Sequence, residues 1–483
     1  MQASIFNTSV PLTGSDQVFL MNTFTDAQLV VSSEAAVLLE RLDQFAEFTD
    51  DEREAVQELA QHGFVVTDRE SERLALDKFF SGVHENTDEM RVTVLTTLQC
   101  NFACDYCLQG DHGDYNLHAN KMSLETAHQV CDWLTERLDT IKPKKLALTF
   151  FGGEPLLNLP VLYEIAERVW AETQLRGVEM QIHVITNGLL LTPEVVDRLK
   201  PFGLNGFKVT LDGDRETHDR MRPLRGGQGT FDKIIENVRQ VADKCNIAIG
   251  GNFDEDSVDS YPALLDFLKT QDFADSLVKV AFKPIISMSP SATAPAKSEM
   301  NGMIPLTAVD ANGKALGGGC MTAAGSGSAG NSPCDTCHFL DEKMSTLLEE
   351  TKQRGFHTLD GVHMGPCEIH MKHGYTIGTD GSLYACPGFA TETHESVGHI
   401  DGRHDSLRAQ AEARYDAIGA WRNCGDCSFI PVCAGGCSVA SHNELGDINT
   451  PSCHKTSIES ALVSLAHEAA GLSTPPIGEG GNA

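Results

Sequence analysis

The 483-residue sequence is poor in basic residues and contains no apolar run of transmembrane length. Lysine and arginine together number 37 against 68 acidic residues, so the formal net charge is −31. This balance argues against a nucleic-acid partner, because phosphate binding requires clustered basic side chains. A basic segment followed by an apolar one, the pattern of a secretory signal, is also lacking. We therefore predict a cytoplasmic protein that does not associate with membranes.

Cysteine, in contrast, is abundant, with 15 residues. In a reducing compartment, clustered cysteines are more often metal ligands or catalytic groups than disulfides. Three of them, Cys100, Cys104 and Cys107, lie in the segment CNFACDYC. Zinc sites require four ligands and disulfides require pairs, whereas three thiolates can hold three irons of a [4Fe–4S] cube. The alternative is a structural metal site with a remote fourth ligand.

The first 85 residues predict a small module of their own. Residues 18–31 have the pattern of a β-hairpin with a turn near Asp26, and a helix follows a serine cap in SSEAAVLLERL. In the next predicted helix, Thr49 and Glu52 have the spacing of a capping box, and a short strand, GFVV, follows. Hairpin, two helices and a wing-like strand indicate a winged-helix-like α+β module. The alternative is a packing domain without a substrate.

From residue 91, six apolar, β-rich runs alternate with amphipathic segments: 92–98, 146–151, 181–186, 206–211, 246–252 and 279–285. Successive β–α units predict an α/β core over residues 90–286, built on a parallel sheet or barrel with its site at the carboxyl ends of the strands. Cys131 lies on the apolar face of one helix and Cys245 opens a strand, so both are predicted core residues. Three further regions are predicted after the core: a Gly/Ser-rich insertion and connecting helix (287–360), a cysteine-dense domain (361–455) and a C-terminal helix with a disordered tail (456–483).

Three further polar segments follow predicted strands: FFGGEP (150–155), ITNG (185–188) and VTLDGDRETHDRMRP (209–223). Glycine allows close approach of the backbone to a ligand, and Glu154 offers an acceptor for an ammonium group. Together with the CxxxCxxC loop, these segments resemble the signature of the radical SAM superfamily. The resemblance implies a partial (β/α)6 TIM-like barrel. It also implies a catalytic [4Fe–4S] cluster on Cys100, Cys104 and Cys107 whose open iron is chelated by S-adenosylmethionine (AdoMet).

The resemblance implies that the GGE motif, residues 152–154, contacts the methionyl amine of AdoMet. It also implies that Thr210 and Arg222 bind the ribose and the carboxylate of AdoMet, and that Tyr106 lies near the adenine. The full set of AdoMet-binding residues that it implies is Tyr106, Gly152, Gly153, Glu154, Thr186, Asn187, Thr210, Asp212 and Arg222.

The C-terminal cysteines resemble the seven-cysteine SPASM extension, which carries two auxiliary iron–sulfur clusters, here expected to be of the [4Fe–4S] type. By position, the distal cluster would be held by Cys424, Cys427, Cys433 and Cys453, and the proximal one by Cys367, Cys386 and Cys437. The alternative is a pair of zinc knuckles. The fourth proximal position is either open or filled by His370, His373 or a cysteine of the insertion. Cys320, Cys334 and Cys337 could be ligands, a redox pair or surface thiols.

The resemblance implies reductive cleavage of AdoMet to a 5′-deoxyadenosyl radical and modification of a ribosomally made precursor peptide by a thioether or C–C crosslink. The nearest likeness is to geopeptide-type maturases, with the N-terminal module in the role of leader-peptide recognition. The expected electron donor is a low-potential flavodoxin or ferredoxin. One alternative is a formylglycine-forming anaerobic sulfatase maturase, although Pro387 stands where those enzymes place an aspartate. Another is a chain that binds peptide or shuttles electrons without radical chemistry.

Overall fold

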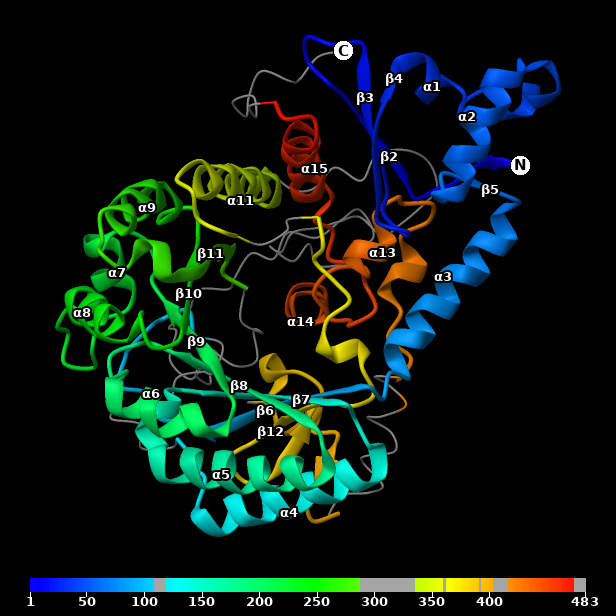
Figure 1. Ribbon diagram of the computed structural model, residues 1–483. Coiled ribbons are helices and arrows are strands. Elements are labelled where there is room, and N and C mark those ends of the chain that lie inside the picture. The colour runs from blue at the N-terminus through cyan, green and yellow to red at the C-terminus, as the bar shows by residue number, and fades with distance from the viewer. Residues whose placement is uncertain are drawn as a thin grey trace, which may run out of the picture.

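The computed structural model describes residues 1–107, 119–286, 335–358, 362–390, 392–402, 413 and 416–472. Its centre is a nine-stranded sheet in the order β11-β10-β9-β8-β7-β6-β12-β13-β14. Figure 1 shows helices covering one side of the parallel strands, while the segments around α13 and α14 lie on the other side. Within the described residues, no helix combines the length and apolarity needed to cross a bilayer.

The N-terminal elements confirm the predicted hairpin, caps and short strand. A three-stranded antiparallel sheet, β2-β3-β4, turns at Asp26, which has a φ of 60°, and Thr49 and Glu52 form the reciprocal capping box. A 16-residue helix, α3, was not predicted, although Asp68 caps it. The elements are β1 (Gln2–Ala3), β2 (Asn7–Pro11), β3 (Gln17–Asn22), β4 (Ala27–Ser32), α1 (Ser33–Val37), α2 (Asp50–Gln61), β5 (Val65–Val66) and α3 (Arg69–His84).

The six predicted strands of the core are all present and pair in parallel in sequence order. They are β6 (Glu89–Thr97), β7 (Lys145–Gly152), β8 (Glu179–Thr186), β9 (Leu204–Thr210), β10 (Asn246–Phe253) and β11 (Leu277–Pro284). Their helices are α4 (Leu124–Ile141), α5 (Leu159–Arg176), α6 (Pro193–Leu199), α7 (Arg215–Met221), α8 (Phe231–Val241) and α9 (Tyr261–Lys269). Cys131 is buried as predicted. Cys245 is only half-buried, because it lies in the connection between α8 and β10.

The C-terminal region extends the same sheet. β12 (Gly374–Ile377) pairs in parallel with β6, and β13 (Ser382–Tyr384) and β14 (Gly398–His399) follow in antiparallel order. This continuation was not predicted, because β6 and β12 are far apart in the sequence. The remaining helices are α11 (Asp335–Gln353), α13 (Ile430–Cys433), α14 (Ser438–Ala440) and α15 (Lys455–Ala469). The predicted insertion, 287–333, and the tail from 473 lie outside the described residues.

The N-terminal sheet packs between two cores because successive residues of a strand face opposite sides. Phe19 and Met21 of β3 join a cluster that includes Phe429 and Leu462 of the C-terminal region, whereas Leu20 joins a cluster formed with α1 and α2. Phe80 of α3 also stacks on Trp421, with ring centroids 3.9 Å apart. The N-terminal module therefore shares apolar surface with the cysteine-rich region.

Candidate functional site

The three-cysteine loop begins directly after β6, at the carboxyl end of the parallel sheet. Burial, together with the neighbouring charges of Glu154, Cys104 and Cys107, raises the pKa of the Cys100 thiol to about 12. Burial likewise raises the pKa of Cys104 to about 11, against the opposing charge of Arg222. Thiolates gathered in a protected place require a positively charged group such as iron to stay ionised. The three residues therefore fit the ligand set of an iron–sulfur cluster.

The GGE segment lies against the start of this loop. The amide of Gly153 donates to Thr97 O at 2.9 Å, and the amide of Glu154 donates to Gln99 O at 2.8 Å. A Cβ at Gly152 would lie 2.2 Å from Thr97 O, and one at Gly153 would lie 2.3 Å from Gln99 O. Such approaches are shorter than any side chain tolerates. The glycines were expected to let the backbone approach a ligand. In this structure they let the GGE segment approach the backbone that leads into the cysteine loop.

Glu154 is fully buried, and burial raises its pKa. Its Oε1 accepts hydrogen bonds from Thr186 Oγ1 at 2.8 Å and Leu156 N at 3.0 Å. Its Oε2 accepts one hydrogen bond, from Asn187 N at 2.8 Å. A carboxylate oxygen can accept two, so Oε2 retains the capacity to bind an ammonium group. Thr186 and Asn187, both predicted cofactor residues, act here by orienting Glu154.

Asp212, Arg222 and Tyr106 form a second cluster at the ends of β9 and of the cysteine loop. Arg222 Nη1 donates to Tyr106 Oη at 2.5 Å and to Asp212 Oδ2 at 3.2 Å, while the Tyr106 hydroxyl donates to Asp212 Oδ2. Asp212 Oδ1 accepts from the Asn252 amide at 2.7 Å. Arg222 Nε is buried and has no hydrogen-bond partner among the described residues. A buried donor without a partner is costly, and a ligand carboxylate would satisfy it. Thr210, the last residue of β9, is half-buried beside this cluster.

Several residues that support the site were not predicted. Asn101 accepts a hydrogen bond from Asn187 Nδ2 at 2.7 Å, and Arg225 Nε donates to Cys100 O at 2.9 Å. His218 is buried, and its Nδ1 accepts from the Asp212 amide at 3.1 Å. Burial holds the pKa of His218 well below its usual value, so it acts as a neutral acceptor. In the sequence, His218 lies within the segment 209–223 and Arg225 lies just after it. This position was the only signal for the two residues.

The seven C-terminal cysteines lie in two groups. Burial raises the pKa of Cys386 to about 12, and the nearby thiols that contribute to this rise are Cys367 and Cys437. Burial raises the pKa of Cys424 to about 12 as well, and the contributing thiols there are Cys433, Cys427 and Cys453. These groups of three and four have the same members as the two predicted ligand sets.

The spacing of these thiols differs from that of a zinc site. Four thiolates bound to zinc at about 2.3 Å would lie roughly 3.8 Å from one another. In the described part of the chain, no three cysteine sulfurs lie within 4.8 Å of one another.

Of the two histidines considered for the proximal set, His370 lies beside it, with Nδ1 3.7 Å from Cys367 Sγ and with Nε2 buried and unpartnered within the described structure. The charges that act on His373 are those of Lys372, Glu85, His84 and Arg137, which are not members of the set. Cys320, Cys334 and the side chain of Cys337 lie outside the described residues.

One further group has donor atoms suited to a divalent ion. Oxygen and nitrogen atoms of Glu392, Glu395 and His442 lie within 4.8 Å of one another. Mixed carboxylate and imidazole donors suit zinc, iron or manganese. The sequence pattern did not reveal this group, because His442 lies far along the chain from Glu392 and Glu395.

Comparison with known proteins agrees with this geometry. Residues 94–259 match the family model of the Radical SAM superfamily. The chain is 30% identical over 187 residues to the AdoMet-dependent heme synthase of Methanosarcina barkeri, covering 38% of this chain and 47% of that protein. It is 21% identical over 247 residues to the radical SAM cyclopropyl synthase TigE of Paramaledivibacter caminithermalis, covering 47% of this chain and 50% of TigE. The chain thus spans about half the length of these curated relatives.

Among solved structures, anSMEcpe with bound AdoMet superposes with a TM-score of 0.56 at 16% identity, covering 79% of this chain and 100% of that one. A structure of anSMEcpe with AdoMet and the Kp18Cys peptide gives a TM-score of 0.56 at 15% identity, covering 80% and 100%. At this identity the likeness shows the fold. Residues 94–259 thus match the radical SAM family in sequence, and the chain shares its fold with anSMEcpe; the matched family implies a [4Fe–4S] cluster and AdoMet for this region.

Proposed function

We propose that this chain is a radical SAM/SPASM enzyme that modifies a ribosomally made precursor peptide by forming a thioether or C–C crosslink. The observation that carries the proposal is the grouping of seven C-terminal cysteines into a set of three and a set of four, in a chain whose residues 94–259 match the radical SAM family model. Two further [4Fe–4S] clusters would be held there. The implied location is the cytoplasm.

The residues of the core divide the work of cofactor binding. Cys100, Cys104 and Cys107 would hold the [4Fe–4S] cluster, Glu154 Oε2 would accept a hydrogen bond from the methionyl ammonium, and Arg222 Nε would bind an anionic group of AdoMet. When bound, the cluster and AdoMet supply the 5′-deoxyadenosyl radical that removes hydrogen from an unactivated carbon. His218 and Asn252 hold Asp212 in place, and Asp212 in turn fixes the guanidinium of Arg222.

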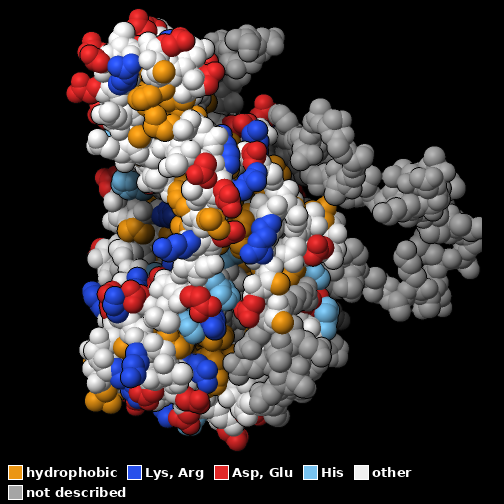
Figure 2. All heavy atoms as spheres, turned by 90° about the vertical axis from the view of Figure 1, so that its right-hand side faces the viewer, with side chains coloured by type: hydrophobic (Ala, Val, Ile, Leu, Met, Phe, Trp, Pro, Cys, Tyr) orange, Lys and Arg blue, Asp and Glu red, His pale blue; other side chains and the backbone are white. Residues whose placement is uncertain are grey.

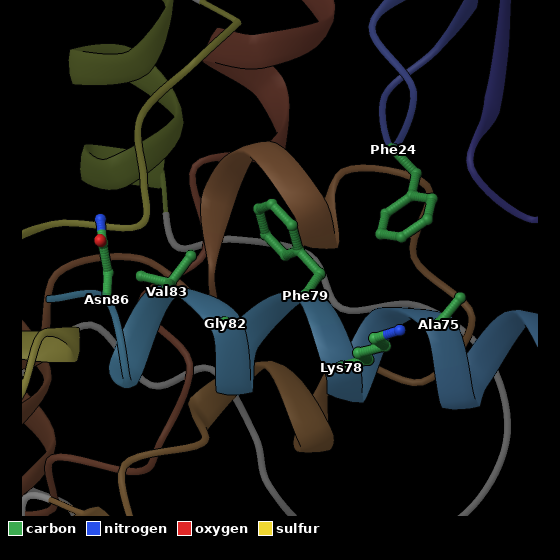
Figure 3. Close-up of a pocket in the computed structure, with 7 residues that line it drawn as sticks. All are labelled: Phe24, Ala75, Lys78, Phe79, Gly82, Val83 and Asn86. Atoms are coloured by element: carbon green, nitrogen blue, oxygen red, sulfur yellow. The ribbon is translucent and has the colours of Figure 1, made fainter. Parts of the chain in front are cut away.

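The N-terminal module offers a docking place for the precursor. A shallow, open groove of about 570 Å³ lies along α3 beside the hairpin turn, and its apolar side chains include Phe24, Phe79 and Val83, as Figure 3 shows. Figure 2 views the side of the molecule on which α3 lies and shows hydrophobic side chains gathered between charged ones. Helix α3 leads directly into β6, whose far end carries the cysteine loop. A leader segment held in this groove would be tethered to the domain that contains the active site.

The variant Gly82→Leu tests this docking place. A Cβ at Gly82 meets no atom within 4 Å, so leucine would fill the groove and also favour the helix. We expect affinity for the precursor, measured by fluorescence anisotropy of a labelled leader peptide, to fall roughly tenfold. Thermal stability should be no lower than that of the wild type. Gly82→Ala is the matched control and should bind normally. Equal binding by both variants would place the leader elsewhere.

The auxiliary cysteines give a separate prediction. Replacing Cys386 and Cys437 together by alanine should remove one cluster, about four irons of roughly twelve per chain. The variant should still form 5′-deoxyadenosine, because the ligands of the core cluster are intact, but should not release modified peptide. Iron analysis and chromatography of the nucleoside measure the two effects. An unchanged iron content would exclude these residues as ligands.

The alternative is a formylglycine-forming enzyme like the anaerobic sulfatase maturases. Pro387 follows Cys386 directly, and a proline side chain has no group able to accept a proton. This absence at the position of the expected base favours crosslinking over formylglycine formation. A chain that binds peptide or carries electrons without radical chemistry is the remaining class.

Anaerobic incubation of the reconstituted protein with AdoMet, a candidate precursor and reduced flavodoxin or ferredoxin distinguishes these functions. Formylglycine made from serine also removes two hydrogen atoms, so the precursor for this test carries cysteine and no serine. A crosslink then removes two hydrogen atoms and retains the sulfur, whereas formylglycine made from cysteine loses that sulfur. Mass spectrometry separates the two products. Formation of neither 5′-deoxyadenosine nor modified peptide would refute the enzyme assignment.

A further inference from the structure

Three lysines share one face of the parallel sheet. On β9 and β11, Phe207, Val209, Val280 and Phe282 are buried in the core. Because side chains alternate along a strand, the residues between them project from the opposite face. In Figure 1 the helices α7, α8 and α9 lie on one side of these strands and α14 on the other. The residues on the face away from α7–α9 include the lysine cluster: Lys208, Lys279 and Lys283.

The strand register brings these lysines together. Lys208 on β9, Ala248 on β10 and Lys279 on β11 are aligned across three adjacent strands, and Lys283 is aligned with Asn252. The residues between the lysines are small. A Cβ at Gly250 would lie 2.5 Å from Lys208 Cε, so the Lys208 side chain crosses over this glycine.

The lysine cluster has no anionic partner within the described structure, in which none of its members forms an ion pair. Burial, followed by the charges of Lys283 and Lys279, lowers the pKa of Lys208 to about 8. The Lys208 side chain is nevertheless exposed to solvent, so the lysine cluster is accessible to an external group. In a chain with a net charge of −31, three neighbouring cations without a carboxylate indicate a site for an external anion.

The cluster also lies beside the cofactor site. Asn252, the neighbour of Lys283 in the register, donates its amide to Asp212 at 2.7 Å. Thr210, a predicted AdoMet contact, follows Lys208 by two residues and so lies on the same face of β9. A group bound by the lysine cluster would therefore lie on the face of the sheet that carries the site and next to Asp212.

We propose that the lysine cluster is an anion subsite that receives an aspartate or glutamate side chain of the peptide substrate. The inference rests on the proposed function, because it names the kind of substrate side chain that would enter the active site. The AdoMet carboxylate already has a suitable donor in Arg222 Nε, which leaves the lysines for the substrate. A carboxylate there would be held by paired charges while the adjacent part of the peptide faces the cofactor.

The test uses the reconstituted full chain and two fluorescein-labelled probes, hexaglutamate and hexaglutamine. We expect anisotropy to show binding of hexaglutamate alone, weakening as salt is added. Each of K208Q, K279Q and K283Q should weaken it roughly fivefold, the size of one accessible ion pair. Lys233→Gln is the control, since Lys233 lies exposed on α8 and already pairs with Glu236 at 2.9 Å. Hexaglutamate should also protect the lysine cluster, and not Lys233, from acetylation.

Equal binding of the two probes, or unchanged binding in all three variants, would overturn the proposal. So would a rise in the AdoMet concentration required for 5′-deoxyadenosine formation in the variants, with hexaglutamate binding unchanged, because the lysines would then serve AdoMet. Binding and protection are measured without turnover. Failure of the proposed function, seen as absence of 5′-deoxyadenosine in the wild type, is therefore distinguishable from failure of the subsite.

Discussion

Joint replacement of Cys100, Cys104 and Cys107 by alanine is expected to abolish formation of 5′-deoxyadenosine and to remove about four of roughly twelve irons per chain. The three thiols lie near one another at the end of β6, and AdoMet cleavage requires the cluster that they would hold. Iron analysis of anaerobically prepared protein and chromatography of the nucleoside measure the two effects. The auxiliary clusters should survive, because their predicted ligands come from other segments.

The control for this variant is Cys245→Ala. Cys245 is half-buried between α8 and β10 and belongs to none of the cysteine groups, so its loss should change neither measurement. The apo forms of the wild type and the triple variant should unfold at similar temperatures, since alanine replaces a small side chain. Retention of nucleoside formation by the triple variant would show that the cluster lies elsewhere.

The second large effect is expected for Gly153→Ala. The added Cβ would lie 2.3 Å from Gln99 O and 2.5 Å from Leu98 O. Both are backbone atoms of the segment leading to Cys100, so the clash can be relieved only by moving the cysteine loop away from Glu154. We expect loss of the core cluster's iron, or a fall of roughly a hundredfold in the rate of 5′-deoxyadenosine formation, because small displacements of reacting groups have effects of this size.

Gly177→Ala separates the clash from backbone strain. Gly177 has a φ of +65° at the end of α5, but a Cβ there meets no atom within 4 Å. This change should cost about 1 kcal/mol of stability and leave iron content and nucleoside formation unchanged. If Gly153→Ala behaves like Gly177→Ala, the contact between the GGE segment and the cysteine loop does not position the cluster.

Local elements followed from the sequence because short-range patterns specify them. The apolar alternation of the six strands, the capping box of Thr49 and Glu52, and the buried face that contains Cys131 depend only on neighbouring residues. Helix α3 was missed although Asp68 caps it, because its apolar positions are fewer and its buried residues include Glu72. Cys245 was placed in the core because a strand was expected one residue too early.

The sequence by itself predicted which residues would carry the chemistry: the three-cysteine loop, the GGE segment, Asp212 and Arg222, and the seven later cysteines. Only the tertiary structure decided how they meet. It placed Gly153 against Gln99 O, left Arg222 Nε without a described partner, paired β12 with β6 and aligned Lys208 with Lys279. The reason is physical. Motif spacing and periodicity record local backbone geometry, whereas these contacts join segments far apart in the chain, whose pairing is set by packing and register.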